Sequence, residues 1–162
     1  MDEMLMLACK KLHFGSSLVA NAKKIKAKNH LDFLLELFNT EIEHRELKHR
    51  NAYIKAAKFD LMKTSPGYTF EDIKFPTTLT ADDIMQTAFV PRRENLIFYG
   101  NVGAGKTHLA IATGLAACDA GFKTGFWRTA MLVNALTDAK RNGTLSIFMR
   151  KLEKLDLLIC DE

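Results

Sequence analysis

Residues Gly100–Thr107 read GNVGAGKT and complete the pattern G-x-x-x-x-G-K-[ST]. The apolar run Asn95–Tyr99 (NLIFY) precedes this stretch, and a helical pattern, His108–Cys118 (HLAIATGLAAC), follows it. A strand that leads through a glycine-rich loop into a helix is the setting in which this pattern cradles phosphates. The stretch therefore predicts a nucleotide-binding loop and disfavours the alternative, a glycine-rich turn with an incidental lysine.

The residue types in this loop suit a triphosphate. Glycines let successive backbone N–H groups converge without Cβ clashes, and the helix that begins near Lys106 adds the positive end of its dipole. Lys106 is expected to reach the β- and γ-phosphates, and the Thr107 hydroxyl is expected to bind Mg²⁺. For His108, packing is favoured over catalysis. The predicted nucleotide-binding residues are Gly100, Asn101, Val102, Gly103, Ala104, Gly105, Lys106, Thr107 and His108.

Two acidic residues, Asp161 and Glu162, follow an apolar pattern that is typical of a strand. Leu155–Glu162 reads LDLLICDE and ends in Asp161 and Glu162. The carboxyl end of a parallel strand is where such a sheet presents its ligand site. We expect Asp161 to hold Mg²⁺ and Glu162 to polarise the attacking water as general base. Glu162 and Lys106 are the predicted catalytic residues. The acidic pair favours hydrolysis of the nucleotide over phosphoryl transfer to a small acceptor. The alternative is that Asp161 and Glu162 are only an acidic pair on the protein surface.

The chain divides into three parts by pattern. Residues 1–65 are helical and include Leu31–Lys63, a long helical pattern without glycine or proline. Residues 66–94 form a linker and bridging segment, introduced by the turn signal Thr64–Gly67. Residues 95–162 alternate strands and helices, which predicts a parallel sheet covered on both faces. The predicted fold class is an α/β P-loop NTPase sheet preceded by an all-α region.

Individual elements and caps follow from the same patterns. Strands are expected at Asn95–Tyr99, Lys123–Arg128 and Asp156–Cys160, and the later helices at Ala130–Arg141 and Leu145–Leu155. The expected helix caps are Ser16 or Ser17, Asn29, Thr80 and Thr129.

The net charge of +4 is concentrated before the loop. Residues 1–63 hold 12 Lys and Arg against 8 Asp and Glu, whereas residues 64–162 hold 11 of each. A basic helical region suits contact with nucleic-acid phosphates, because Lys and Arg displace their counterions. A solvated, salt-bridged helix surface is an equally good explanation of the same charges.

The cysteines and the hydropathy indicate the compartment. Cys9, Cys118 and Cys160 are far apart and form no C-x-x-C pair, which predicts free thiols in a reducing cytosol. Cys160 is expected to be a small buried side chain. No stretch approaches the ~20 apolar residues that cross a bilayer, so a cytoplasmic protein without a membrane partner is expected.

On these motifs the chain resembles the IstB family of AAA+ ATPases, the helper proteins of bacterial insertion sequences and relatives of the DnaC helicase loader and the DnaA initiator. The resemblance covers essentially the whole chain. It rests on a long basic helix followed by GNVGAGKTHLA, KTGFWRTA and LDLLICDE, the first and last being its Walker A and Walker B motifs. Lys106–Ala110 (KTHLA) favours this family over P-loop kinases that act on small molecules.

The resemblance implies a function and partners. Such a protein binds ATP and Mg²⁺, forms an ATP-dependent homo-oligomer on double-stranded DNA, and recruits or activates a transposase. A DnaC-like loader, whose partner is a replicative helicase, is the alternative function.

The resemblance also implies that more chain is needed. Family members continue past the acidic pair with two further core strands, a sensor residue and an arginine finger. Their strand order places a later strand between the strands that end at Tyr99 and Cys160. We therefore expect these 162 residues to be a fragment or a truncated product that folds poorly alone and does not hydrolyse ATP. An inactive remnant is the remaining alternative.

Overall fold

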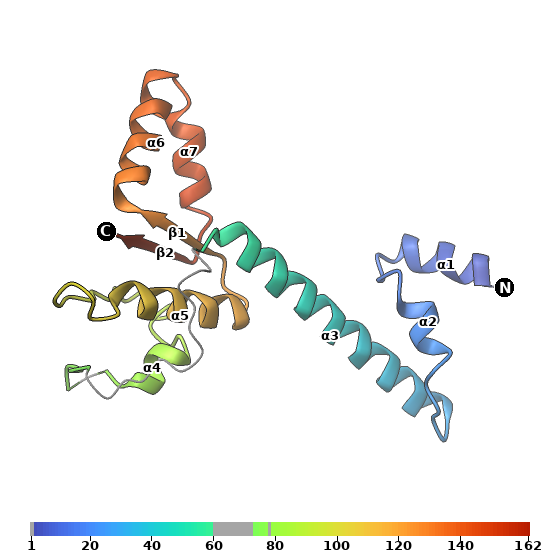
Figure 1. The fold of residues 1–162 in the computed structure, drawn as a ribbon. Helices are drawn as coiled ribbons and strands as arrows, with labels where there is room; N and C mark the ends of the chain where they lie inside the picture. Colours follow the sequence, from blue (N-terminus) through green and yellow to red (C-terminus); the bar gives the residue numbers. More distant parts are fainter. Residues whose placement is uncertain (1, 60–72, 78) are drawn as a thin grey trace. The chain divides into compact units, whose positions relative to one another are not determined.

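The computed structural model describes residues 2–59, 73–77 and 79–162. The chain forms two compact units, Met1–His49 and Arg50–Glu162. Figure 1 labels the elements in chain order from α1 to β2. The linker signal at Thr64–Gly67 and the last residues of the predicted long helix lie outside the described residues. Among the described residues, no helix is long and apolar enough to cross a membrane.

The first unit is helical, as predicted. It contains α1 (Asp2–Lys11), α2 (Leu18–Ala22) and the first part of α3 (His30–Ala57). Its small core consists of the buried side chains of Cys9, Leu18, Val19 and Leu37. Asn29 caps α3 as expected, because its Oδ1 accepts a hydrogen bond from the Asp32 N–H at 2.9 Å. Ser17 stands at the N-cap of α2, which is one of the two predicted positions, but its side chain makes no cap hydrogen bond.

A buried carboxylate fastens the turn between α1 and α2 to α3. The side chain of Glu41 is only 4% exposed and accepts hydrogen bonds from the Gly15 N–H at 2.7 Å and from Arg45 Nε at 2.8 Å. The Arg45 guanidinium also donates to the His13 carbonyl and lies 5.6 Å from the centre of the Phe14 ring. The turn is therefore held by polar contacts as well as by the small core.

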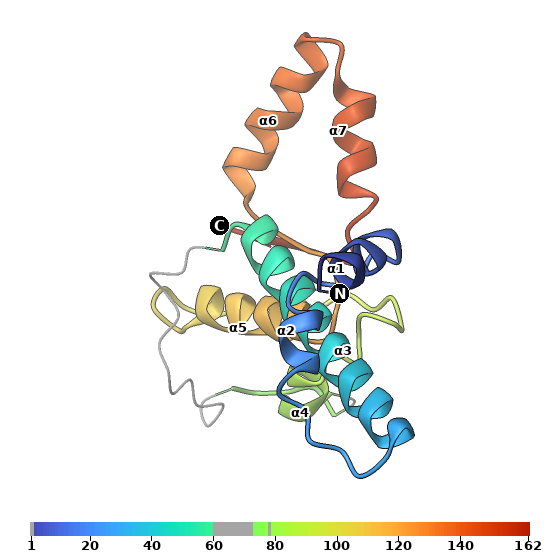
Figure 2. The same cartoon turned by 90° about the vertical axis from the view of Figure 1, so that its right-hand side faces the viewer.

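The second unit contains a two-stranded parallel sheet. Its strands are β1 (Thr124–Arg128) and β2 (Leu157–Asp161), paired in register from Thr124 with Leu157 to Arg128 with Asp161. The helices are α4 (Ala81–Met85), α5 (Lys106–Asp119), α6 (Thr129–Arg141) and α7 (Leu145–Leu152). α5 lies on one side of the strands, whereas α6 and α7 form a hairpin that projects on the other side (Figure 1, Figure 2). The parallel sheet and the helical connection between its strands agree with the sequence pattern.

The core of this unit joins α5 to the sheet and to the last turns of α3. Its buried members are Ala57, Phe59, Ile111, Cys118 and Phe126. Gly114 of α5 lets two of its neighbours approach the helix: a Cβ on Gly114 would lie 2.6 Å from Phe59 Cε1 and 2.7 Å from Ile159 Cδ1. At the end of α5, Asp119 forms an ion pair with Arg50 of α3. The helix that follows the glycine-rich loop is thus fixed at its far end.

The predicted strand at Asn95–Tyr99 is wrong for the structure as described. This segment is assigned no strand, and a cavity of about 320 Å³ lies between Asn95–Phe98 and β2. A strand is defined by a hydrogen-bonded neighbour, and the sheet of the described residues supplies none beside this segment. The strand that the resemblance places between these two segments stays a prediction.

The open side of the sheet also corrects the prediction for Cys160. All three cysteines are free thiols, as expected, and Cys9 and Cys118 are buried. Cys160, by contrast, is exposed, because side chains alternate along β2 and one of its two faces is only partly covered. Burial raises the pKa of the Cys118 thiol, which keeps it protonated at neutral pH.

Candidate nucleotide-binding site

The glycine-rich loop adopts the backbone conformations that its glycines permit. Gly103 and Gly105 have φ angles of +83° and +82°, a left-handed region that residues with a Cβ rarely occupy. Gly105 is the N-cap of α5, so the helix begins at Lys106, directly after the loop. The N–H groups of the first turn have no partner within their own helix and are available to an anion.

Lys106 folds over the loop that precedes it. Its Nζ donates hydrogen bonds to the main-chain oxygens of Gly100 at 2.9 Å and Asn101 at 3.1 Å. These two bonds place the ammonium group beside the loop backbone, where its charge complements a bound phosphate. His108 follows in the same helical turn and is half-buried, in keeping with the packing role expected for it.

The loop and the acidic pair meet at one contact. The Thr107 hydroxyl oxygen lies 2.9 Å and 3.0 Å from the two carboxylate oxygens of Asp161. A hydroxyl next to a carboxylate is a set of hard oxygen ligands, which is the chemistry that Mg²⁺ prefers. The residues present therefore fit this ion, and the two predicted metal ligands are brought together across 54 positions of sequence.

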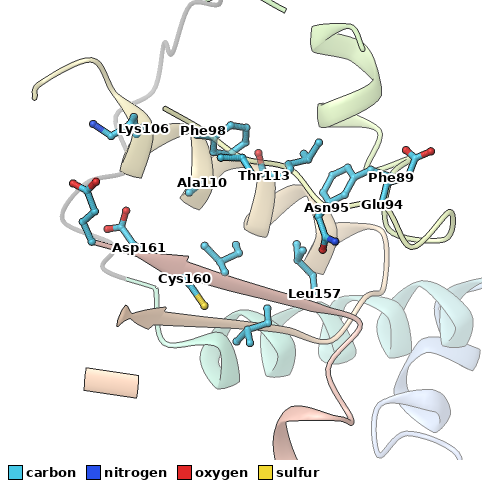
Figure 3. A pocket seen from close by; sticks show the side chains of 15 residues that line it. Phe89, Glu94, Asn95, Phe98, Lys106, Ala110, Thr113, Leu157, Cys160 and Asp161 are labelled. Atoms are coloured by element: carbon cyan, nitrogen blue, oxygen red, sulfur yellow. The ribbon is translucent and has the colours of Figure 1, made fainter. Parts of the chain in front are cut away.

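Glu162 lines the same cavity as Lys106 and Asp161. The cavity of about 320 Å³ beside β2 is lined by Lys106, Asp161 and Glu162, together with apolar side chains of α5 and β2. Figure 3 shows Lys106 and Asp161 at the same end of this cavity. The two predicted catalytic residues and Asp161, one of the two predicted metal ligands, therefore line one cavity, and Glu162 is exposed to solvent.

A second hollow adjoins the glycine-rich loop. This cavity of about 520 Å³ is lined by residues 97–101 and by Ile73, Lys74, Ala104, Lys106 and Leu109. The bridging segment and Leu109 were missed as site residues by the sequence analysis. The pattern of residues 70–75, FEDIKF, is apolar and aromatic, and such a pattern does not indicate contact with a ligand.

Thr129 is not the helix cap that the sequence predicted. α6 begins at Thr129 itself, and Arg128 stands at the N-cap position without a side-chain cap bond. The Thr129 hydroxyl instead donates to the main-chain oxygen of Asp161 at 2.8 Å. Because Thr129 is already the first residue of α6, its hydroxyl stands one position too late to cap the helix, and the hydroxyl proton goes to the carbonyl at the end of β2.

A family model described as IstB-like ATP binding protein matches residues 11–162. The chain belongs to this family. The match begins in α1 and includes the glycine-rich loop, both strands and the acidic pair.

Individual relatives agree with this assignment. The chain is similar to the ATP-binding protein of insertion sequence IS5376 from Geobacillus stearothermophilus, with 34% identity over 131 residues. It is also similar to the IS21 ATP-binding protein from Pseudomonas aeruginosa, with 32% identity over 163 residues. These alignments cover 81% and 99% of this IstB-like chain, but only 52% and 61% of the two relatives.

The chain also has a more distant similarity to a replication initiator protein. The chain is 30% identical over 141 residues to the chromosomal replication initiator protein DnaA of Thermosipho melanesiensis. This alignment covers 81% of the IstB-like chain and 31% of the initiator.

Proposed function

We propose that the glycine-rich loop binds the triphosphate of ATP together with Mg²⁺, and that the longer protein hydrolyses this ATP as an AAA+ transposition helper. The observation that carries the proposal is the contact between Thr107 and Asp161. It joins the phosphate loop to the strand that ends in the acidic pair, which is the arrangement that hydrolysis requires. The name of the family supports ATP as the nucleotide.

Each residue has a distinct task in this proposal. The loop N–H groups and Lys106 bind and orient the phosphates, while Thr107 and Asp161 hold Mg²⁺. The ion supplies charge neutralisation at the phosphate oxygens when it is bound. Glu162 accepts a proton from the attacking water, as a general base one residue beyond the metal ligand. The cavity between the loop and the bridging segment, lined in part by Ile73 and Leu109, takes the apolar face of the nucleoside.

The partners are proposed from the family and the charge distribution. A homo-oligomer on double-stranded DNA, recruiting a transposase in the cytoplasm, agrees with relatives that are named for insertion sequences. The basic residues Lys23, Lys24, Lys26 and Lys28 of the first unit are a suitable phosphate-contacting patch. A helicase loader is the second candidate, favoured by the likeness to a replication initiator.

Co-sedimentation with long duplex DNA tests the proposal. The full chain is mixed with DNA in ATP, in ADP or without nucleotide, and the parent is compared with Lys106→Ala and with Lys154→Ala, an exposed lysine distant in sequence from the loop. ATP-dependent DNA binding that Lys106→Ala loses and Lys154→Ala keeps supports the transposition helper. DNA binding without regard to nucleotide contradicts it, and capture of a replicative helicase without DNA selects the loader.

A further inference from the structure

Thr129 makes a contact that the start of a helix does not require. Its hydroxyl donates to the main-chain oxygen of Asp161, which lies 32 positions later in the sequence. The strand register pairs Arg128 with Asp161, so this bond stands at the very end of the β1–β2 ladder. Because the backbone turns into α6 at Thr129, its side chain satisfies a carbonyl that the ladder no longer reaches.

Asp161 is consequently held from two sides. Its carboxylate contacts the Thr107 hydroxyl in the first turn of α5, and its carbonyl accepts from the Thr129 hydroxyl in the first turn of α6. That carbonyl belongs to the peptide group that joins Asp161 to Glu162. Its direction therefore fixes the point from which the Glu162 side chain departs.

Thr107 and Thr129 would have different roles when a metal ion is bound. In the proposed function the Thr107 hydroxyl becomes a ligand of Mg²⁺, and its direct bond to the Asp161 carboxylate competes with that role. The Thr129 hydroxyl donates to a main-chain oxygen, and the proposed function gives this hydroxyl no second task. Its bond is therefore the one that persists when Thr107 changes partners.

We propose that Thr129 is a positioning residue, which keeps the Asp161–Glu162 peptide in register with β1 and so holds the general base in place. The inference rests on the proposed function, because it assigns Thr129 a part in hydrolysis without contact to the nucleotide. A purely structural role for the hydroxyl at the start of α6 is the competing explanation, and the two roles differ in what a substitution changes.

The test compares three variants of the longer protein to which the proposed hydrolysis belongs. Thr129→Val removes the hydroxyl at nearly constant shape, and Thr129→Ser retains it. Thr137→Val is the matched control, because Thr137 lies two turns further along α6 and donates to the Val133 carbonyl at 2.9 Å. The measurements are the ¹³C chemical shift of the Asp161 carbonyl, which responds to hydrogen bonding, the Kd for ATP with Mg²⁺, and kcat for ATP hydrolysis.

Thr129→Val is expected to move the Asp161 carbonyl resonance, leave the ATP Kd unchanged and lower kcat roughly 3- to 10-fold, the effect of one lost hydrogen bond. Thr129→Ser should keep the parental Asp161 carbonyl resonance and the parental kcat, and Thr137→Val should change neither the resonance nor kcat. An unmoved resonance, a parental kcat in Thr129→Val, or an equal loss in Thr137→Val would overturn the inference. Failure of the parent to hydrolyse ATP contradicts the proposed function instead, and the resonance then decides on its own whether Thr129 holds the peptide.

Discussion

The Thr107 hydroxyl oxygen lies within 3.0 Å of both carboxylate oxygens of Asp161, which joins the helix after the glycine-rich loop to the end of β2. Neither residue alone indicates a nucleotide site, since a threonine in a first helical turn and an aspartate at a strand end are both common. Their contact makes the loop and the acidic pair parts of one site.

Asp161→Asn should weaken ATP binding only when Mg²⁺ is present. The amide keeps the shape and can still pair with Thr107, but it removes the negative charge that attracts the ion. We expect the gain in ATP affinity that Mg²⁺ provides to fall by roughly tenfold or more, in line with a lost interaction with a charged group. Titration with ATP in Mg²⁺ and in EDTA measures it. Asp138→Asn, an exposed acid on α6, is the control and should keep the full gain.

In the longer protein, Glu162→Gln should separate ATP binding from ATP hydrolysis. The amide cannot accept a proton from water, so the variant is expected to bind ATP with parental affinity while hydrolysis falls by about 10²-fold or more. Single-turnover measurements with the protein in excess of ATP give both quantities. Hydrolysis at the parental rate would show that Glu162 is not the general base.

Glu41→Gln should destabilise the first unit. Burial alone raises the pKa of the Glu41 carboxyl, but hydrogen bonds from the Gly15 N–H and Arg45 and the Arg45 charge outweigh it, and the pKa lies below its ordinary value of 4.5. Because the folded state lowers this pKa, the stabilisation is complete above pH 4.5 and is lost as the pH falls through the lowered value.

Amide hydrogen exchange of α1 and α2 measures this effect. At pH 7, Glu41→Gln is expected to lower the local stability by about 1–3 kcal/mol, because a charge-assisted hydrogen bond to a buried group is lost. The difference from the parent should shrink at acid pH, where the parental carboxylate is protonated. Glu43→Gln, an exposed neighbour on α3, should have no such effect at either pH. Equal behaviour of the two variants would show that the buried contacts do not fasten the turn.

Gly114→Ala should loosen the core between α5 and the sheet. An added methyl group favours the helix by itself, but here it would lie 2.6 Å from the Phe59 ring. Overpacking of this kind costs about 1–3 kcal/mol of the free energy of unfolding. Urea denaturation checks the value, and the double variant with Phe59→Leu should recover much of the loss. No recovery would mean that the ring is not the cause.

The sequence was most informative where a local pattern determines the chemistry. GNVGAGKT and the terminal Asp161 and Glu162 are short motifs whose spacing relative to a strand and a helix predicts their roles, and the structure places them together. The capping motifs at Asn29 and Thr80 are equally local, and both caps are confirmed. The two strands that pair with one another were also predicted, to within a residue at each end.

The predictions failed where the outcome depends on a distant partner. Asn95–Tyr99 has the apolar pattern of a strand, but strand formation needs a neighbour that the described residues do not provide. Thr129 has the residue type of a helix cap, but α6 begins at Thr129 itself, one residue earlier than predicted, and the hydroxyl donates to the Asp161 carbonyl. The hydrogen bond between Glu41 and Gly15 joins residues that are 26 positions apart, and the hydrophobic periodicity of the sequence does not predict it.

The most direct test of the account is equilibrium binding of ATP to the full chain in the presence of Mg²⁺, with Lys106→Ala and Lys154→Ala in parallel. We predict saturable binding that weakens in EDTA, is lost in Lys106→Ala and is unchanged in Lys154→Ala. Binding that is indifferent to both Mg²⁺ and Lys106 would contradict the claim that the glycine-rich loop and Asp161 form one nucleotide site.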